Sequence, residues 1–295
     1  MKKLLLCLLL CVAAKAYSQK GYYITSADKM KLWVNEYGTG KPVILLAGGP
    51  GLTATYMDSI WLKMPNTRFI VLDERSTGKS VLPKVDSTTI TVNNFIEDVE
   101  AVRVHLNLPK VTIVGHSWGS MLALLYTEKY PDRVENLILL AGASTGNFFS
   151  YFEDNFMMRL TAKEKLDLAL PDSDGMVGFK AYWPGYFYSR DRALVTRKNI
   201  TPASFGKDFS RMDDIIFKEY ASYSLISAKK LKFYTGPVSL IQGRQDPTDE
   251  ATIDETKGYL KQTQVYIIEK CGHFPWLEEP ETSKSFFKAL QAVLN

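Results

Sequence analysis

Four short apolar runs rich in β-branched residues recur through the first half of the chain, and longer segments separate them. The runs are PVILLA at 42–47, RFIVLD at 68–73, KVTIVG at 110–115 and VENLILLAG at 134–142. Such runs are typical of strands that are buried on both faces. Because parallel neighbours need a long crossover connection, usually a helix, the alternation predicts an α/β fold with a mostly parallel sheet flanked by helices.

Helical periodicity fills the segments between these runs. Residues 91–107 place apolar side chains on one side at helical spacing, and both this segment and residues 118–130 end just before a proline. Upstream, GYYIT and KLWVNEYG flank a polar turn and indicate an antiparallel hairpin. The alternation resumes late in the chain with PVSLIQG, a helix near 249–260, QVYIIE and a last helix near 280–294.

Residues 145–235 interrupt the alternation. They contain aromatic clusters (FFSYF, AYWPGYFY, FKEYASYSL) and helical stretches without strong strand runs, and the segment is too long for a loop. We expect a helical cap that packs its aromatic side chains on itself and covers a pocket. The α/β core would then comprise 17–144 and 236–295.

Residues 1–16 carry the pattern of a secretory signal peptide. Two lysines open the chain, an unbroken apolar stretch reaches Ala14, and the small-residue site Ala14-Lys15-Ala16 follows. We expect cleavage after Ala16 and export, either to the periplasm or out of the cell. The apolar stretch is well short of the ~20 residues of a membrane-spanning helix, so we expect no stable membrane insertion.

Loss of that segment would remove three lysines and no acidic residue, so the formal net charge of +4 would fall to +1. A nearly neutral chain offers no electrostatic attraction for nucleic acid. Cys271 would be the one remaining cysteine, which excludes an internal disulfide. The His, Cys, Asp and Glu residues show no metal-ligand spacing, and we expect neither a metal nor another cofactor.

The stretch GHSWGS at 115–120 follows a predicted strand and opens a predicted helix. In that setting G-x-S-x-G indicates a serine on a strained strand-to-helix turn, where the glycines keep side chains out of the crossing. The amino-terminal N–H groups and dipole of the helix would lie near negative charge that develops on a substrate. We therefore predict that Ser117 is a nucleophile.

A serine nucleophile needs a base, and the chain has three histidines. His105 lies within a predicted helix. His116 is adjacent to Ser117, and neighbouring side chains at a strand end point apart. His273 lies in a loop after the last predicted strand and is the predicted base.

The base needs an acid that orients it. Asp246 follows the strand before the last one and is the predicted partner of His273. Asp249 is the rival, although its position suits the cap of the next helix better. The order Ser117, Asp246, His273 is the order of the α/β-hydrolase triad.

Three stretches resemble motifs of the proline iminopeptidase (prolyl aminopeptidase) family, which has the α/β-hydrolase fold. LAGGPG at 46–51 is similar to the family's HGGPG, DERSTGKS at 73–80 to its DQRGxGxS, and GHSWGS to its GGSWGS. The resemblance covers essentially the whole mature chain. This chain departs from the motifs at Ala47, Glu74 and Ser76.

The resemblance implies roles for further residues. The backbone N–H groups of Gly49 and Trp118 would form the oxyanion hole, and the neighbouring glycines would let a substrate oxygen approach them. Typical members hold the substrate's amino terminus with glutamates of the cap, including a Trp-Glu pair that AYWPGYFYS lacks. The cap acids that could replace them are Glu153, Asp154, Asp213, Asp214 and Glu219. Of these, Glu153 and Glu219 are the predicted substrate-binding residues.

Three functional hypotheses remain open. A serine aminopeptidase that releases an amino-terminal residue, proline-type, from short peptides follows from the resemblance. An esterase or lactonase that acts on small molecules would use the same triad. A non-catalytic binding protein on this fold would have to leave an intact triad unused. In each case the predicted partner is a small molecule or a short peptide.

Overall fold

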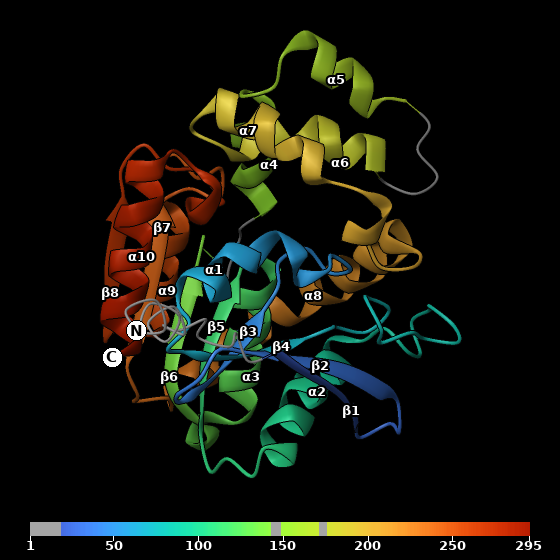
Figure 1. Ribbon diagram of the computed structural model, residues 1–295, viewed down its shortest axis with the longest axis vertical. Helices are drawn as coiled ribbons and strands as arrows, with labels where there is room; N and C mark the ends of the chain where they lie inside the picture. Colours follow the sequence, from blue (N-terminus) through green and yellow to red (C-terminus); the bar gives the residue numbers. More distant parts are fainter. Residues whose placement is uncertain (1–18, 143–148, 171–175) are drawn as a thin grey trace, which may run out of the picture.

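The computed structural model describes residues 19–142, 149–170 and 176–295, and Figure 1 shows an α/β body beneath a group of helices. The predicted signal peptide, residues 1–16, lies outside the described residues. Within them, no helix is both long enough and apolar enough to cross a membrane.

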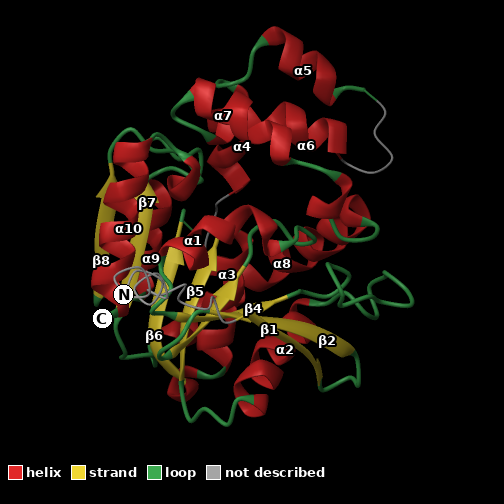
Figure 2. Ribbon diagram, in the orientation of Figure 1, coloured by secondary structure: helices red, strands yellow, loops and turns green. Residues whose placement is uncertain are grey.

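The strands form one sheet in the order β1-β2-β4-β3-β5-β6-β7-β8 (Figure 2). Their bounds are β1 Gln19–Thr25, β2 Lys31–Tyr37, β3 Pro42–Leu46, β4 Arg68–Leu72, β5 Val111–His116, β6 Val134–Leu140, β7 Val238–Gly243 and β8 Thr263–Ile268. β1 and β2 form the predicted hairpin, and β2 also runs antiparallel to β4. The other neighbours are parallel, which confirms the predicted α/β fold with a mostly parallel sheet.

Helices cover both faces of the sheet because both faces of its strands are apolar. Val43 and Leu45 of β3 pack in the core beneath α1 and α10, whereas Ile44 and Leu46 pack on the opposite side. This alternation follows from the period of two in a strand. One face carries α1 (Asp58–Lys63) and α10 (Pro280–Leu294), and the other carries α2 (Val92–His105), α3 (Trp118–Lys129), α8 (Phe209–Leu231) and α9 (Ala251–Tyr259).

Helices between β6 and β7 form the cap that lies above the sheet in Figure 1: α4 (Phe149–Met157), α5 (Ala162–Leu168), α6 (Met176–Tyr182) and α7 (Arg190–Thr196). Aromatic rings pack on one another there. The ring of Phe156 lies 4.9 Å from that of Tyr182 and 4.8 Å from that of Tyr186, measured between centroids. Tyr186 ends the short 3-10 helix η3 (Trp183–Tyr186).

The helix α8 departs from the predicted cap boundary at residue 235. Its residues Met212, Ile216 and Tyr220 are buried in the same core as Trp118 of α3. α8 therefore belongs to the helical layer of the α/β body, and the cap ends before it. The predicted first residue of the cap, at 145, lies outside the described residues.

The parallel strands bring the predicted site together at one edge of the sheet. Leu46 at the end of β3 pairs with Gly115 of β5, and His116 at the end of β5 pairs with Leu140 of β6. Loops that follow the carboxyl ends of neighbouring parallel strands therefore meet, which is where ligands bind in open α/β sheets.

Candidate active site

Ser117 lies between β5 and α3 in a strained backbone conformation. Its φ is 53° and its ψ is −118°, which an L-residue rarely adopts. The turn is stabilised by hydrogen bonds from Ser117 N–H to the carbonyl of Leu140 (3.1 Å) and from Ser120 N–H to the carbonyl of Ser117 (2.9 Å).

Two glycines allow the strand and the helix to cross so closely. A Cβ at Gly115 would lie 2.2 Å from the carbonyl oxygen of Gly119, and a Cβ at Gly119 would lie 2.4 Å from the carbonyl oxygen of Leu46. Both obstacles are backbone atoms, which cannot rotate away. The glycines at both ends of G-x-S-x-G are thus required by packing.

Asp246 and His273 form the pair that the sequence predicts. His273 Nδ1 lies 2.9 Å from Asp246 Oδ1 and 3.0 Å from Oδ2, and both side chains are buried. A carboxylate accepts this bond, so Nδ1 carries the proton and Nε2 keeps its lone pair. The rival Asp249 instead accepts a hydrogen bond from Ala251 N–H at the start of α9.

A cavity of about 660 Å³ contains both Ser117 and His273 in its lining. Gly49 and Trp118 line the same cavity, so the residues of the predicted oxyanion hole lie beside the candidate nucleophile. Trp118 is the first residue of α3, and Gly49 has a φ of +54° that suits a glycine. Among the described residues, no group of three or more acidic, His or Cys side chains is placed to hold a metal ion.

The other two histidines have different surroundings. His105 is exposed, and its ring stacks on Tyr22 with centroids 5.0 Å apart. His116 is buried beneath the site, with its ring nitrogens bonded to Tyr56 and to the backbone of His273. Burial holds the pKa of His116 well below its usual range.

The cavity receives two carboxylates from the helices around it, and they are not the predicted pair. Glu153 of α4 lines the cavity, and Asp213 of α8 lies in its wall together with Phe209 and Phe217. Glu219, the other predicted substrate-binding residue, does not line this cavity, and its Oε2 accepts a hydrogen bond from Val92 N–H (3.0 Å) at the start of α2.

Helical spacing explains why Asp213 faces the cavity. Residues 209, 213 and 217 are four apart and share one side of α8, whereas Met212 and Ile216 face the core. Burial raises the pKa of Asp213 to about 7, with a smaller contribution from Asp214. Tyr182 lines the same cavity, and its pKa is raised by burial and, to a smaller extent, by the charges of Glu153 and Asp213.

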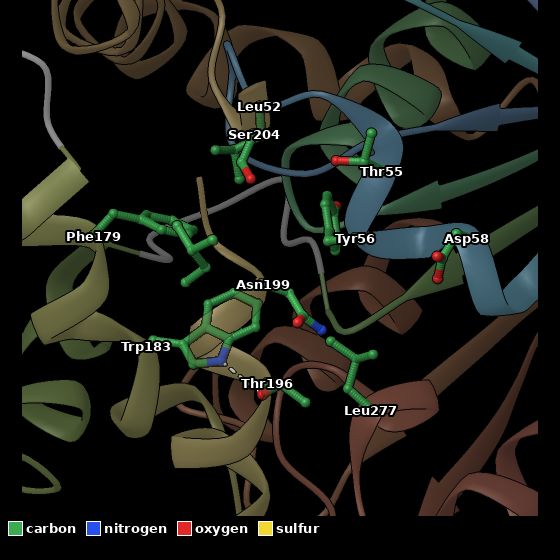
Figure 3. Close-up of a pocket in the computed structure, with 11 residues that line it drawn as sticks. Leu52, Thr55, Tyr56, Asp58, Phe179, Trp183, Thr196, Asn199, Ser204 and Leu277 are labelled. Carbon is green, nitrogen blue, oxygen red and sulfur yellow. Dashed lines mark hydrogen bonds between the residues drawn. The ribbon is translucent and has the colours of Figure 1, made fainter. Parts of the chain in front are cut away.

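A smaller cavity of about 290 Å³ lies between the α/β body and the cap. Figure 3 shows Tyr56 and Asp58 on one side of it and Phe179 and Trp183 on the other. Phe179 also lines the larger cavity. No member of the Ser-Asp-His set lines the smaller cavity, so the candidate chemistry belongs to the larger one.

Comparison with known proteins supports the fold described above. A family model described as the alpha/beta hydrolase fold matches residues 41–280. A proline iminopeptidase of Heyndrickxia coagulans is 25% identical over 262 residues, which cover 84% of this chain and 89% of the relative. A cis-3-alkyl-4-alkyloxetan-2-one decarboxylase of Shewanella oneidensis is also 25% identical, over 86% of this chain and 83% of its own length. The crystal structure of a proline iminopeptidase-related protein from Thermus thermophilus superposes with a TM-score of 0.72 at 21% identity, covering 94% of this chain and 98% of the other.

Proposed function

We propose that this chain, which belongs to the α/β-hydrolase family, is a serine hydrolase. Its proposed reaction is the release of an amino-terminal residue from short peptides. The observation that carries the aminopeptidase part is the pair of carboxylates, Asp213 and Glu153, in the cavity that contains Ser117 and His273. Similarity to a proline iminopeptidase over most of both chains supports the same reaction.

In the proposed reaction Ser117 Oγ attacks the carbonyl carbon of the first peptide bond while His273 Nε2 takes the serine proton. Asp246 stabilises the imidazolium through Nδ1, and the N–H groups of Gly49 and Trp118 stabilise the oxyanion. His273 then gives its proton to the leaving amine, and an acyl-enzyme remains. Water, deprotonated by the same imidazole, releases the amino acid and restores the serine.

Asp213 and Glu153 would bind the ammonium group of the substrate. The surrounding side chains are largely apolar, among them Phe152, Phe156 and Phe179. Because burying a charge in such surroundings is costly without a partner, a pair of carboxylates favours a cationic amine and disfavours a blocked one. The apolar walls would contact the side chain of the released residue.

The nucleophile is tested by Ser117→Ala. Alanine removes the attacking oxygen and fits the same tight turn, so we expect kcat to fall on the order of 10⁴-fold or more while the melting temperature changes little. Turnover of 4-nitrophenyl acetate and of alanine and proline arylamides measures it. A variant that retained about a tenth of the wild-type rate would refute the role of Ser117.

The aminopeptidase part is tested with matched arylamides that carry a free or an acetylated amine. Acetylation leaves Asp213 and Glu153 without their cation, and we expect on the order of a 10²-fold or greater loss in kcat/KM. Asp213→Asn should reduce kcat/KM for the free amine at least about tenfold and leave the acetylated substrate unaffected.

Asp214→Asn is the matched control, because Asp214 is the next residue on α8, is exposed and pairs with Lys218. Asp214→Asn should leave kcat/KM unchanged for both the free-amine and the acetylated arylamide. Equal cleavage of both arylamides would remove the aminopeptidase reaction. Rapid ester turnover in that case would favour the small-molecule esterase or lactonase alternative, which the apolar cavity walls also suit.

A further inference from the structure

A chain of hydrogen bonds runs beneath the candidate site and starts at the glycine loop. Gly48 N–H lies 2.6 Å from the hydroxyl oxygen of Tyr56, and that oxygen lies 2.8 Å from His116 Nδ1. His116 Nε2 lies 2.9 Å from the carbonyl oxygen of His273. His116 is only 1% exposed, so both of its ring nitrogens are buried.

The chemistry of the groups assigns every proton in this chain of bonds. A carbonyl oxygen only accepts hydrogen bonds, so His116 Nε2 must carry a proton and donate a hydrogen bond to the backbone carbonyl of His273. Burial favours the neutral imidazole, and Nδ1 is therefore an acceptor. The hydroxyl of Tyr56 then donates to Nδ1, and its oxygen accepts the bond from Gly48 N–H.

These bonds join the three segments that carry the proposed catalytic groups. Gly48 precedes Gly49 of the oxyanion hole, His116 precedes the nucleophile Ser117, and the third bond ends on the backbone of His273 itself. Ring contacts reinforce the arrangement: the His116 ring lies 4.8 Å from those of both His273 and Trp276.

The backbone of His273 is thus held on both sides. Its N–H donates to the carbonyl of Tyr186 in the cap (2.7 Å), and its carbonyl accepts from His116. Trp276 Nε1 in turn donates to the backbone carbonyl of Tyr56 (2.9 Å). Because Asp246 fixes only the side chain of His273, the bond from His116 supplies a separate constraint on where that residue sits.

We propose that His116 and Tyr56 are positioning residues that set the distance between the imidazole of His273 and Ser117 and the place of Gly49 in the oxyanion hole. This inference rests on the proposed serine-hydrolase function. The protein has His116 where the resembled motif GGSWGS has glycine, and it has Ala47 where HGGPG has histidine. The imidazole that Tyr56 links to Gly48 comes from the nucleophile's own strand, β5.

His116→Leu and His116→Gln separate positioning from simple packing. Leucine fills the space but leaves the carbonyl of His273 without its donor, whereas the glutamine amide N–H reaches the place of Nε2. We expect His116→Leu to lower kcat for 4-nitrophenyl acetate by about 10- to 100-fold, since a misplacement of about 1 Å costs up to about 10²-fold, with KM nearly unchanged. His116→Gln should recover most of the wild-type kcat.

Tyr56→Phe is the second variant, and it keeps the ring while removing the hydroxyl. We expect a loss of kcat about as large as that of His116→Leu, because Gly48 N–H and His116 Nδ1 both lose their partner. His105→Leu, at an exposed histidine outside the site, is the matched control and should leave kcat unchanged.

Each kcat is calculated per active site, and the number of active sites is measured by titration with a fluorophosphonate. Unfolded protein is not labelled and therefore does not lower the calculated kcat. Wild-type kcat per titrated site in both His116→Leu and Tyr56→Phe would overturn the inference, even if their melting temperatures fell. Equal losses in His116→Leu and His116→Gln would also overturn it. A wild-type enzyme that fluorophosphonate does not label would instead refute the serine-hydrolase function itself.

Discussion

The ionisation of Asp213 should control how strongly the enzyme prefers a substrate with a free amine to an acetylated one. Its pKa is raised to about 7, chiefly by burial, so it is neutral below that pH and anionic above it. We expect the ratio of kcat/KM for free-amine and acetylated arylamides to rise as the pH increases through about 7. Both substrates need the same nucleophile and base, so effects of pH on that shared chemistry cancel in the ratio.

The free substrate amine loses its proton near pH about 8, so the ratio should decline again at higher pH. Asp213→Asn should abolish the rise near pH 7. The raised pKa of Asp213 also affects the stability of the protein. Because the carboxyl ionises more easily in the unfolded chain, the free energy of unfolding falls as the pH increases from the unfolded pKa to the folded pKa of about 7. Asp213→Asn should therefore raise the melting temperature more at pH 8 than at pH 5. A pH-independent ratio in the wild type would contradict the role of Asp213.

The crossing of β5, α3 and β3 is a feature of whole elements, and Gly119 makes it possible. A Cβ at this position would lie 2.4 Å and 2.5 Å from the carbonyl oxygens of Leu46 and Ala47. We expect Gly119→Ala to lower the free energy of unfolding by about 1–3 kcal/mol, because the helix must move away from the strand. Since that movement displaces Ser117, kcat should fall as well.

Gly258→Ala is the matched control for that substitution. Gly258 is an exposed residue of α9, and a Cβ there meets no atom within 4 Å. Because alanine favours a helix over glycine by about 1 kcal/mol, we expect Gly258→Ala to stabilise the protein and to leave kcat unchanged. Urea unfolding of both variants measures the difference, and two variants of equal stability would contradict the close crossing.

At the scale of the whole molecule, Arg75 links the hairpin to the helical layer. It is 1% exposed and donates to Asp98 of α2 (2.6 and 2.8 Å), to Asp28 in the β1–β2 turn (2.6 and 3.0 Å) and to the carbonyl of Thr89 (3.3 Å). All five guanidinium N–H groups are thus bonded. Arg75 comes from the DERSTGKS stretch, and its role is structural.

We expect Arg75→Met to lower the free energy of unfolding by about 3–5 kcal/mol, because the buried carboxyl of Asp98, whose pKa burial already raises to about 7, would lose its ionic partner. Urea unfolding at pH 7 measures it. Arg244→Met is the control: Arg244 pairs with Glu250 and Glu269, but all three side chains are at least 40% exposed. That variant should be close to wild type in stability. Equal effects of the two substitutions would contradict a linking role for Arg75.

Local patterns in the sequence determined the sheet, its helices and the candidate catalytic set. β-branched apolar runs predict strands buried on both faces, and the glycines around Ser117 predict a close crossing, because both depend on residues that are near in the chain. Asp246 and His273 could be selected because each follows a predicted strand, and parallel strands end at one edge. The contact between Asp246 and His273 spans 27 residues and is explained by the order of the strands.

Tertiary packing alone decided which acidic residue of α8 faces the cavity and which groups bond to the ring of His116. The rotation of α8 about its axis directs Asp213 to the cavity and Glu219 to the start of α2, and that rotation is set by the burial of Met212 and Ile216 against the core. The sequence could not reveal it, because apolar and aromatic residues occur on several sides of α8. The sequence does not reveal which groups bond to the ring of His116. Its partners lie 60 and 157 residues away, one in a short 3-10 helix and one in a loop, so only the folded chain brings them together.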